Sequence, residues 1–253
     1  MRASDLLPFL RTRDLGREAL FFEVTDSTQT RALALVRSGA PHGLLLHTET
    51  QSEGRGRRGR TWLSGAGSLT FSVVLTRAIV AENAAHYSFI AGLGVRRGLT
   101  ALGLTEVQLK WPNDIWYQSR KVGGVLASLE TQPLAVVVGV GLNLSFDPAR
   151  HDETLAQRAG AIDWQGDRAQ LLAEICGGIE HELALYAAHG PAGILAQARA
   201  ALALRGEKVQ VRTQDGMVEG TVTDLADNFS LALATAQGTT QIALGDVWPV
   251  ERA

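Results

Sequence analysis

The sequence predicts an α+β protein, with a mixed, largely antiparallel sheet and helices over residues 1–204 and a small β-barrel over residues 205–253. Three observations predict this division. Apolar strand-like runs alternate with helical patterns before residue 204. Between residues 107 and 144, strand-like runs follow one another through turns too short for crossover helices, so they are expected to be antiparallel neighbours. From residue 205 onward only short strands and turns remain.

The first elements are a strand at residues 19–24 and a helix at residues 26–39. The strand ALFFEV is rich in aromatic and β-branched residues. The helix is predicted because Asp26 or Ser27 can cap its start and Gly39 follows its last apolar position. Two further strands flank a segment rich in glycine and arginine, at 43–49 and 68–76.

A long helix is predicted over 84–103, because apolar side chains recur at helical spacing and Gly103 ends the pattern. The closely spaced strands come next, at 107–111, 113–118, 121–130 and 134–144. Two more helices follow, at 167–188 and 191–203. Asp167 and Gln170 stand in a capping-box-like relation at the start of the first, and Pro191 opens the second.

The segment after residue 205 is expected to hold short strands separated by the turns QDG, ADN and QGT. The strands are predicted at 207–213, 217–225, 229–235, 239–244 and 247–250. Short strands at this spacing without a helical period are typical of a small β-barrel.

The composition is that of a globular cytoplasmic protein. Lys and Arg number 24 against 26 Asp and Glu, so the formal charge of -2 gives no general basic field for nucleic-acid binding. No stretch approaches the ~20 apolar residues of a membrane span, and Asp5 and Pro8 interrupt the N-terminus where a signal peptide needs an apolar run. Cys176 lies in a helical apolar pattern and is expected to pack in the core. No structural metal is expected, because none of the histidines has ligand spacing with a cysteine or acidic partner: His42, His47, His86, His151, His181 and His189.

The stretch GRGRRGR, residues 54–60, has several readings. Its glycines match G-x-G-x-x-G, but a dinucleotide fingerprint must open a helix, and this stretch runs through turn residues into a strand. A nucleic-acid patch needs interleaved aromatic residues, and only Trp62 is near. A solvated surface loop is the plainest alternative. Flexible glycines and mutually repelling guanidinium groups favour instead a loop that closes on a phosphate-bearing ligand and shields a hydrolysable intermediate.

Two further segments place polar groups beside strands. KWPNDIW puts Lys110, Asn113 and Asp114 at a strand end. In RKVGGVLASLE, Lys121 precedes a pair of glycines inside an apolar strand, at 123 and 124. Glycines in a strand interior indicate a bulge or a group that must approach the backbone closely. A plain bulge beside a surface lysine is the alternative.

Taken in order, DST (26–28), TQSEGRGRRGRTW (50–62), KWPND (110–114), RKVGGVL (120–126) and GVGLNL (139–144) resemble the signature of the biotin protein ligases. The resemblance extends from about residue 20 to the C-terminus. It implies a class II synthetase-like core with helices packed on one face of the sheet and a C-terminal barrel. It also implies a two-step enzyme: biotin and MgATP give biotinyl-5′-AMP and pyrophosphate, and a lysine of a carrier domain then takes the biotinyl group.

The resemblance implies a role for each matching residue. The catalytic set is Lys121, Arg55, Arg57 and Asp114, with Asp114 also the candidate for Mg²⁺ bound through the phosphates or for a catalytic base. The biotin-binding set is Ser27, Thr28, Gln51, Gly54, Arg55, Arg57, Lys121, Gly123 and Gly124. The ATP and adenylate set is Arg57, Arg60, Trp62, Asn113, Lys121 and Asn143. Ser27 and Thr28 also fit a plain helix cap.

The resemblance further implies biotinylation, a post-translational modification, of the biotin carboxyl carrier domain of a carboxylase. Only about 20 residues precede the first strand, so no DNA-reading winged helix is expected. No membrane partner is expected, and exposed strand edges leave a homodimer open. The alternatives are a lipoate-type ligase, a non-catalytic biotin sensor, and an RNA-binding module whose arginine loop binds nucleic acid in a salt-dependent way.

Overall fold

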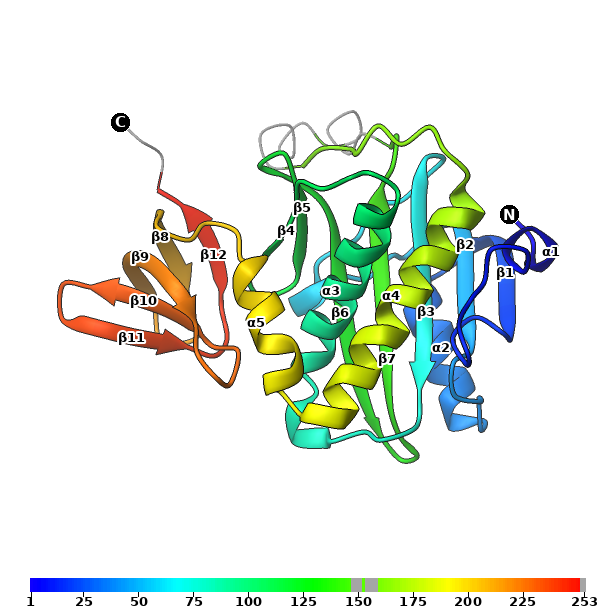
Figure 1. The fold of residues 1–253 in the computed structure, drawn as a ribbon, viewed down its shortest axis with the longest axis horizontal. Coiled ribbons are helices and arrows are strands. Elements are labelled where there is room, and N and C mark those ends of the chain that lie inside the picture. The colour runs from blue at the N-terminus through cyan, green and yellow to red at the C-terminus, as the bar shows by residue number, and fades with distance from the viewer. Residues whose placement is uncertain (147–151, 153–158, 251–253) are drawn as a thin grey trace.

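A computed structural model describes residues 1–146, 152 and 159–250. Its centre is a seven-stranded sheet in the order β1-β2-β3-β7-β6-β5-β4 (Figure 1). The strands are β1 Ala19–Thr25, β2 Leu45–Gln51, β3 Ser68–Leu75, β4 Val107–Lys110, β5 Asp114–Tyr117, β6 Arg120–Thr131 and β7 Leu134–Asn143. Neighbouring strands run antiparallel except β1 and β2, which are parallel. The prediction of a mixed, largely antiparallel sheet is confirmed.

Helices cover both faces of this sheet to different extents. The α-helices are α1 Ala3–Leu6, α2 Thr28–Arg37, α3 His86–Ala101, α4 Arg168–His189 and α5 Ala192–Ala200, and single 3₁₀ turns lie at η1 Arg57–Gly59 and η2 Ala81–Asn83. The long helices α3 and α4 pack together over one face (Figure 1). The short helix α2 lies on the other face, so the expectation of helices on one face holds for the long pair only.

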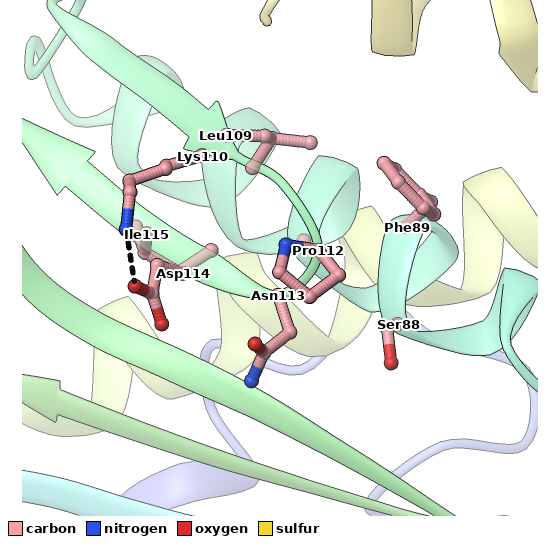
Figure 2. A pocket seen from close by; sticks show the side chains of 9 residues that line it. Ser88, Phe89, Leu109, Lys110, Pro112, Asn113, Asp114 and Ile115 are labelled. Atoms are coloured by element: carbon pink, nitrogen blue, oxygen red, sulfur yellow. Dashed lines mark hydrogen bonds and ion pairs between the residues drawn. The ribbon is translucent and has the colours of Figure 1, made fainter. Parts of the chain in front are cut away.

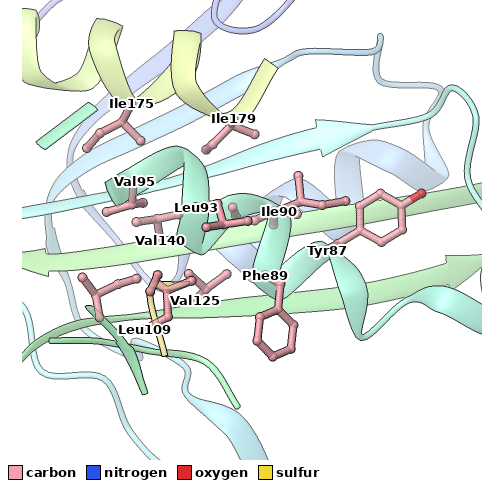
Figure 3. Packing of buried hydrophobic residues seen from close by; sticks show 14 of the residues in the cluster. Tyr87, Phe89, Ile90, Leu93, Val95, Leu109, Val125, Val140, Ile175 and Ile179 are labelled. Carbon is pink, nitrogen blue, oxygen red and sulfur yellow. The ribbon is translucent and has the colours of Figure 1, made fainter. Parts of the chain in front are cut away.

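Alternation along the strands produces the two faces. Val138 and Val140 of β7 point toward α3 and α4 and join the main core, which Figure 3 shows with Leu93 and Ile179. Val137, between them in the sequence, points the other way and packs with α2. The main core also contains Cys176, as predicted, and burial raises the pKa of its thiol to about 12.

Five short strands form a second sheet, here called the C-terminal sheet, in the order β11-β10-β9-β8-β12. Its strands are β8 Lys208–Arg212, β9 Met217–Leu225, β10 Leu231–Thr235, β11 Gly238–Ile242 and β12 Asp246–Pro249. It meets the main sheet beside β4, where the Trp111 indole N–H donates to the Phe229 carbonyl oxygen at 3.1 Å. The ring of Phe229 also lies 4.7 Å, centre to centre, from His86 of α3. Across the described ranges, no helix is long and apolar enough to cross a membrane.

A buried histidine makes the stability of this fold sensitive to pH. His47 of β2 is 0% exposed, packs beside Phe21, and neither of its ring nitrogens has a hydrogen-bond partner among the described residues. Burial lowers the pKa of His47 to about 4, and the nearby Glu49 carboxylate only partly opposes this effect. The folded protein therefore keeps the imidazole neutral.

We expect this histidine to cost stability as the pH falls from about 6.5 toward 4. In that range the unfolded chain binds a proton at residue 47 and the folded chain does not, so the free energy of unfolding declines with falling pH. Between pH 7 and 5 the loss assigned to His47 is about 2 kcal/mol. Urea unfolding at both pH values should show a larger decline in the parent than in His47→Leu. Equal declines in the two proteins would contradict the assignment.

Candidate active site

The pairing register gathers small residues into one row on the α2 face of the main sheet. Gly141 of β7 pairs with Gly124 of β6 on one side and with Thr70 of β3 on the other. Gly124 pairs in turn with Asp114 of β5. Directly paired residues share a face of the sheet. The backbones of Gly141 and Gly124, which carry no side chains, therefore lie side by side next to the Asp114 carboxylate. The next row continues the same surface with Leu126, Gly139 and Ser72.

Two side chains from elsewhere lie over these glycines. A Cβ atom on Gly141 would meet the Trp62 indole ring at 2.4 Å, and one on Gly139 would meet the Gln29 amide oxygen at 2.5 Å. Glycine at both positions therefore makes room for groups that lie flat on the strand. The sequence analysis did not include Gly139 and Gly141 in the site. The sequence signal for these two glycines was their spacing of two within an apolar strand, because that spacing places both on the same face of the sheet.

An open groove of about 680 Å³ lies between this surface and the arginine loop. Leu33 of α2 and Leu126 of β6 give it apolar walls, and Gln29 and Ser128 add polar groups. The loop itself, residues 52–61, forms the remaining wall. Groove size and mixed lining suit a small ligand with an apolar body and a few polar anchors.

The polar corner of the site is built by the start of α2 and the end of β2. The Thr28 backbone N–H donates to the Gln51 side-chain oxygen at 2.8 Å, and the Thr28 hydroxyl lies 2.9 Å from the Ser72 hydroxyl. Ser27 caps α2 by accepting from the Thr30 backbone N–H at 3.4 Å. The predicted set Ser27, Thr28 and Gln51 is thus brought together, and all three carry groups that can hydrogen-bond a polar ring.

Charged side chains meet at the β4–β5 turn. The Asp114 carboxylate lies between two ammonium groups, with Lys121 at 2.6 Å and Lys110 at 3.5 Å. Figure 2 shows the Lys110–Asp114 contact at the turn that carries Pro112 and Asn113. Burial lowers the pKa of Lys110, and the positive charge of Lys121 adds to this effect against the attraction of Asp114.

The arginine loop reaches the same turn. An Arg57 guanidinium N–H donates to the Asn113 side-chain oxygen at 3.3 Å, while the Asn113 amide donates to the Val125 carbonyl oxygen at 2.6 Å. Burial lowers the pKa of Arg57, and repulsion from Arg58 and Arg60 contributes in the same direction. The structure therefore brings Arg57, Asn113, Asp114 and Lys121 into one cluster of charged and polar groups.

Three buried polar atoms near this cluster lack a partner among the described residues. They are the Trp62 indole nitrogen, the Thr70 hydroxyl oxygen and the Asn143 side-chain oxygen. Asn143 uses only its amide nitrogen, which donates to the Gly160 carbonyl oxygen at 3.0 Å. Unpaired buried polar atoms are costly, so these three atoms are candidates to bind a ligand or water.

Three predicted site residues have a different local role. A Cβ atom on Gly54 would meet the Trp62 carbonyl oxygen at 2.2 Å, so this glycine lets the loop close on itself. A Cβ atom on Gly123 would meet the Gly141 carbonyl oxygen and a Leu142 methyl at 2.5 Å each. Gly123 faces the α3 side, and strand packing rather than a ligand requires glycine there. Arg60 forms an ion pair with Asp246 of β12 and not with the β4–β5 turn.

The site does not present a protein-built magnesium centre on Asp114. Magnesium prefers free carboxylate oxygens with water and phosphate ligands, and both Asp114 oxygens contact ammonium groups. Within the described ranges, no cluster of three His, Cys, Asp or Glu side chains could hold a metal ion. The candidate role of Asp114 as a metal ligand does not fit this geometry.

Comparison with known proteins identifies the family of this chain. Residues 21–143 match the model of the biotin/lipoate A/B protein ligase family. The biotin--[acetyl-CoA-carboxylase] ligase of Mycobacterium tuberculosis is 32% identical over 230 residues, covering 88% of this chain and 85% of that protein. The bifunctional ligase/repressor BirA of Bacillus subtilis is 27% identical over 248 residues, covering 94% of this chain and 76% of that protein.

The solved structures give the same answer for the fold. The biotin protein ligase from Aquifex aeolicus, in complex with biotin and ATP, superposes with a TM-score of 0.83 at 26% identity, covering 92% of this chain and 100% of that one. By sequence and by fold, this chain belongs to the biotin/lipoate A/B protein ligase family.

Proposed function

We propose that this chain is an ATP-dependent biotin ligase that forms biotinyl-5′-AMP and transfers the biotinyl group to a lysine of a biotin carboxyl carrier domain. The observation that carries the proposal is the continuity of the site. The groove lined by Leu126 and the arginine loop includes Arg57, and Arg57 reaches the β4–β5 turn, where Asp114 holds Lys121. Such a site accepts a flat apolar ring at one end and joins two anions at the other.

The polar corner provides the recognition of biotin in this proposal. Thr28, Gln51 and Ser27 lie within two positions in sequence of the groove residues Gln29 and Ser52, and their hydroxyl and amide groups match the donors and acceptors of a ureido ring. The apolar walls then hold the ring system and its side chain. This arrangement points the biotin carboxylate toward Lys121.

The first step joins two negatively charged groups. A carboxylate oxygen of biotin attacks the α-phosphorus of ATP, and the bond to the β-phosphate oxygen breaks to release pyrophosphate. Lys121 and Arg57 lower the barrier by offsetting the repulsion between carboxylate and phosphate in a site that excludes water. Asp114 holds the Lys121 ammonium in place at 2.6 Å. Trp62 is proposed to contact the adenine, with Asn113 and Asn143 on the phosphates.

The second step is acyl transfer to the carrier. The neutral amine of the carrier lysine attacks the acyl carbon, a C–N bond forms, the amine loses a proton, and the bond to AMP breaks. Arg55 is proposed to retain the adenylate until the carrier arrives. Mg²⁺ is proposed to enter bound to the ATP phosphates. Because the reaction consumes ATP, we place the protein in the cytoplasm, and we treat residues 205–253 as a separate small domain.

Biotin-dependent exchange of labelled pyrophosphate into ATP tests this function. We expect exchange with biotin and at least about tenfold less with lipoate, because lipoate lacks the ureido group that the polar corner would bind. Heat-unfolded protein serves as the blank for exchange. Absence of exchange from a folded protein with either acid would refute the ligase proposal, and preference for lipoate would reassign the substrate.

A further inference from the structure

The C-terminal sheet reaches the arginine loop through a single carboxylate. Asp246 opens β12, and its Oδ2 atom contacts the Arg58 guanidinium at 3.1 Å and also the Arg60 guanidinium. The Asp246 side chain is only 15% exposed, whereas the side chains of Arg58 and Arg60 are 36% and 55% exposed. Two arginines distant in sequence from β12 thus share one anchor.

The loop needs such an anion on electrostatic grounds. Its guanidinium groups repel one another, and Lys110 adds a further positive charge nearby. Burial acts to raise the pKa of Asp246, but the hydrogen bond from Arg60 and the charges of the loop outweigh it and lower the pKa. Arg58 also holds a left-handed backbone conformation, with φ at 55°, which is costly for a residue other than glycine. An ion pair at this residue offsets that cost.

The anchor divides the four arginines into two pairs. Arg58 and Arg60 are tied to Asp246, whereas Arg57 reaches the β4–β5 turn at Asn113. Among the described residues, Arg55 has no side-chain ion pair or hydrogen bond, and it lines the groove. The arginines at 55 and 57 therefore remain available on the side where the phosphate would lie.

We propose that Asp246 is a positioning residue that anchors the arginine loop to the C-terminal sheet through Arg58 and Arg60, leaving Arg55 and Arg57 to hold the phosphate-bearing ligand. The catalytic part of this inference rests on the proposed ligase function. The structural part, an ordered loop in the protein without ligand, is independent of it. The C-terminal sheet would thereby help to position the arginine loop for the reaction without contacting the reacting atoms.

Asp246→Asn removes the charge with little change in shape. In the full-length protein without ligand, we expect amide hydrogens of residues 54–61 to exchange about tenfold faster than in the parent, with β8 and β9 unchanged. In pyrophosphate exchange, we expect the KM for ATP to rise about tenfold while kcat changes less than about twofold. Asp246→Glu should restore both values toward those of the parent.

Asp215→Asn is the matched control, because Asp215 lies in an exposed turn of the same sheet and loses the same charge. It should leave both readouts unchanged. Unaltered exchange at 54–61 in Asp246→Asn would overturn the inference, as would faster exchange spread over the whole C-terminal sheet or an equal effect of Asp215→Asn. If the parent protein exchanges no pyrophosphate, the ligase proposal fails. The hydrogen-exchange result would still test whether Asp246 anchors the arginine loop.

Discussion

Replacing Lys121 with alanine is expected to reduce biotin-dependent pyrophosphate exchange by about 10³-fold while leaving the protein folded. The Lys121 ammonium lies at the charged end of the groove, 2.6 Å from Asp114. Without it, the carboxylate and the α-phosphate must approach with one compensating cation fewer. Its side chain is 33% exposed and is not one of the buried core residues, so thermal unfolding should change little.

Two further variants sharpen the test of Lys121. Lys208→Ala removes an exposed lysine that pairs with Glu219 on the C-terminal sheet, and it should exchange pyrophosphate like the parent. Lys121→Met keeps the length of the side chain without its charge and should fail like alanine, which separates charge from packing. Activity of Lys121→Ala within about twofold of the parent would remove this residue from the mechanism.

Adding one methyl group at Gly124 is expected to block the ligand without disturbing the protein. A Cβ atom there would meet its nearest neighbours, the Asn113 carbonyl oxygen, an Asp114 oxygen and Lys121 Cε, at 3.7 to 3.9 Å. These are ordinary contacts, so the free energy of unfolding should change by less than about 1 kcal/mol. The methyl group nevertheless projects from the same face of β6 as Leu126, which lines the groove. Biotin affinity, measured by titration calorimetry, should fall by about 10- to 100-fold.

The neighbouring glycine gives the matched control. In Gly123→Ala the new methyl group would meet a backbone carbonyl oxygen and Leu142 at 2.5 Å each, on the face that packs against α3. We expect a loss of stability of about 1 to 3 kcal/mol, measured by urea unfolding. Unchanged biotin affinity in Gly124→Ala would show that the ligand does not lie over this residue, and a loss of stability would show that the site has no room for a methyl group.

Local sequence signals predicted most of the helices and strands and the position of the arginine loop. Period-two apolar runs gave the strands, and glycine and proline marked their ends. The sequence allowed either Asp26 or Ser27 as the N-cap of α2, and in the structure the N-cap is Ser27. The composition of the arginine loop alone indicated a segment that closes on an anion, whereas a role for Lys121 was implied by the resemblance to the biotin protein ligases. The one-turn helix α1 carried too short a pattern to be recognised.

The strand register was not accessible to the same reasoning. Gly123 and Gly124 look equivalent in the sequence, yet the pairing of β6 with β7 turns one toward the core and the other toward the groove. A shift of one residue would exchange their faces. Gly139 and Gly141 could be assigned to the site only after the pairing of β7 with β6 was known, because that pairing determines their neighbours.

By itself, the sequence determined the strands and helices, the charged loop, and the lysine and asparagine at the strand ends, because each depends on residues close together in the chain. Only the tertiary structure decided which glycine lies on the α2 face of the sheet and that Asp246, 186 residues after Arg60, binds the arginine loop. Such contacts depend on how strands pair and how the two sheets meet. No local pattern encodes them, because they result from the packing of the whole chain.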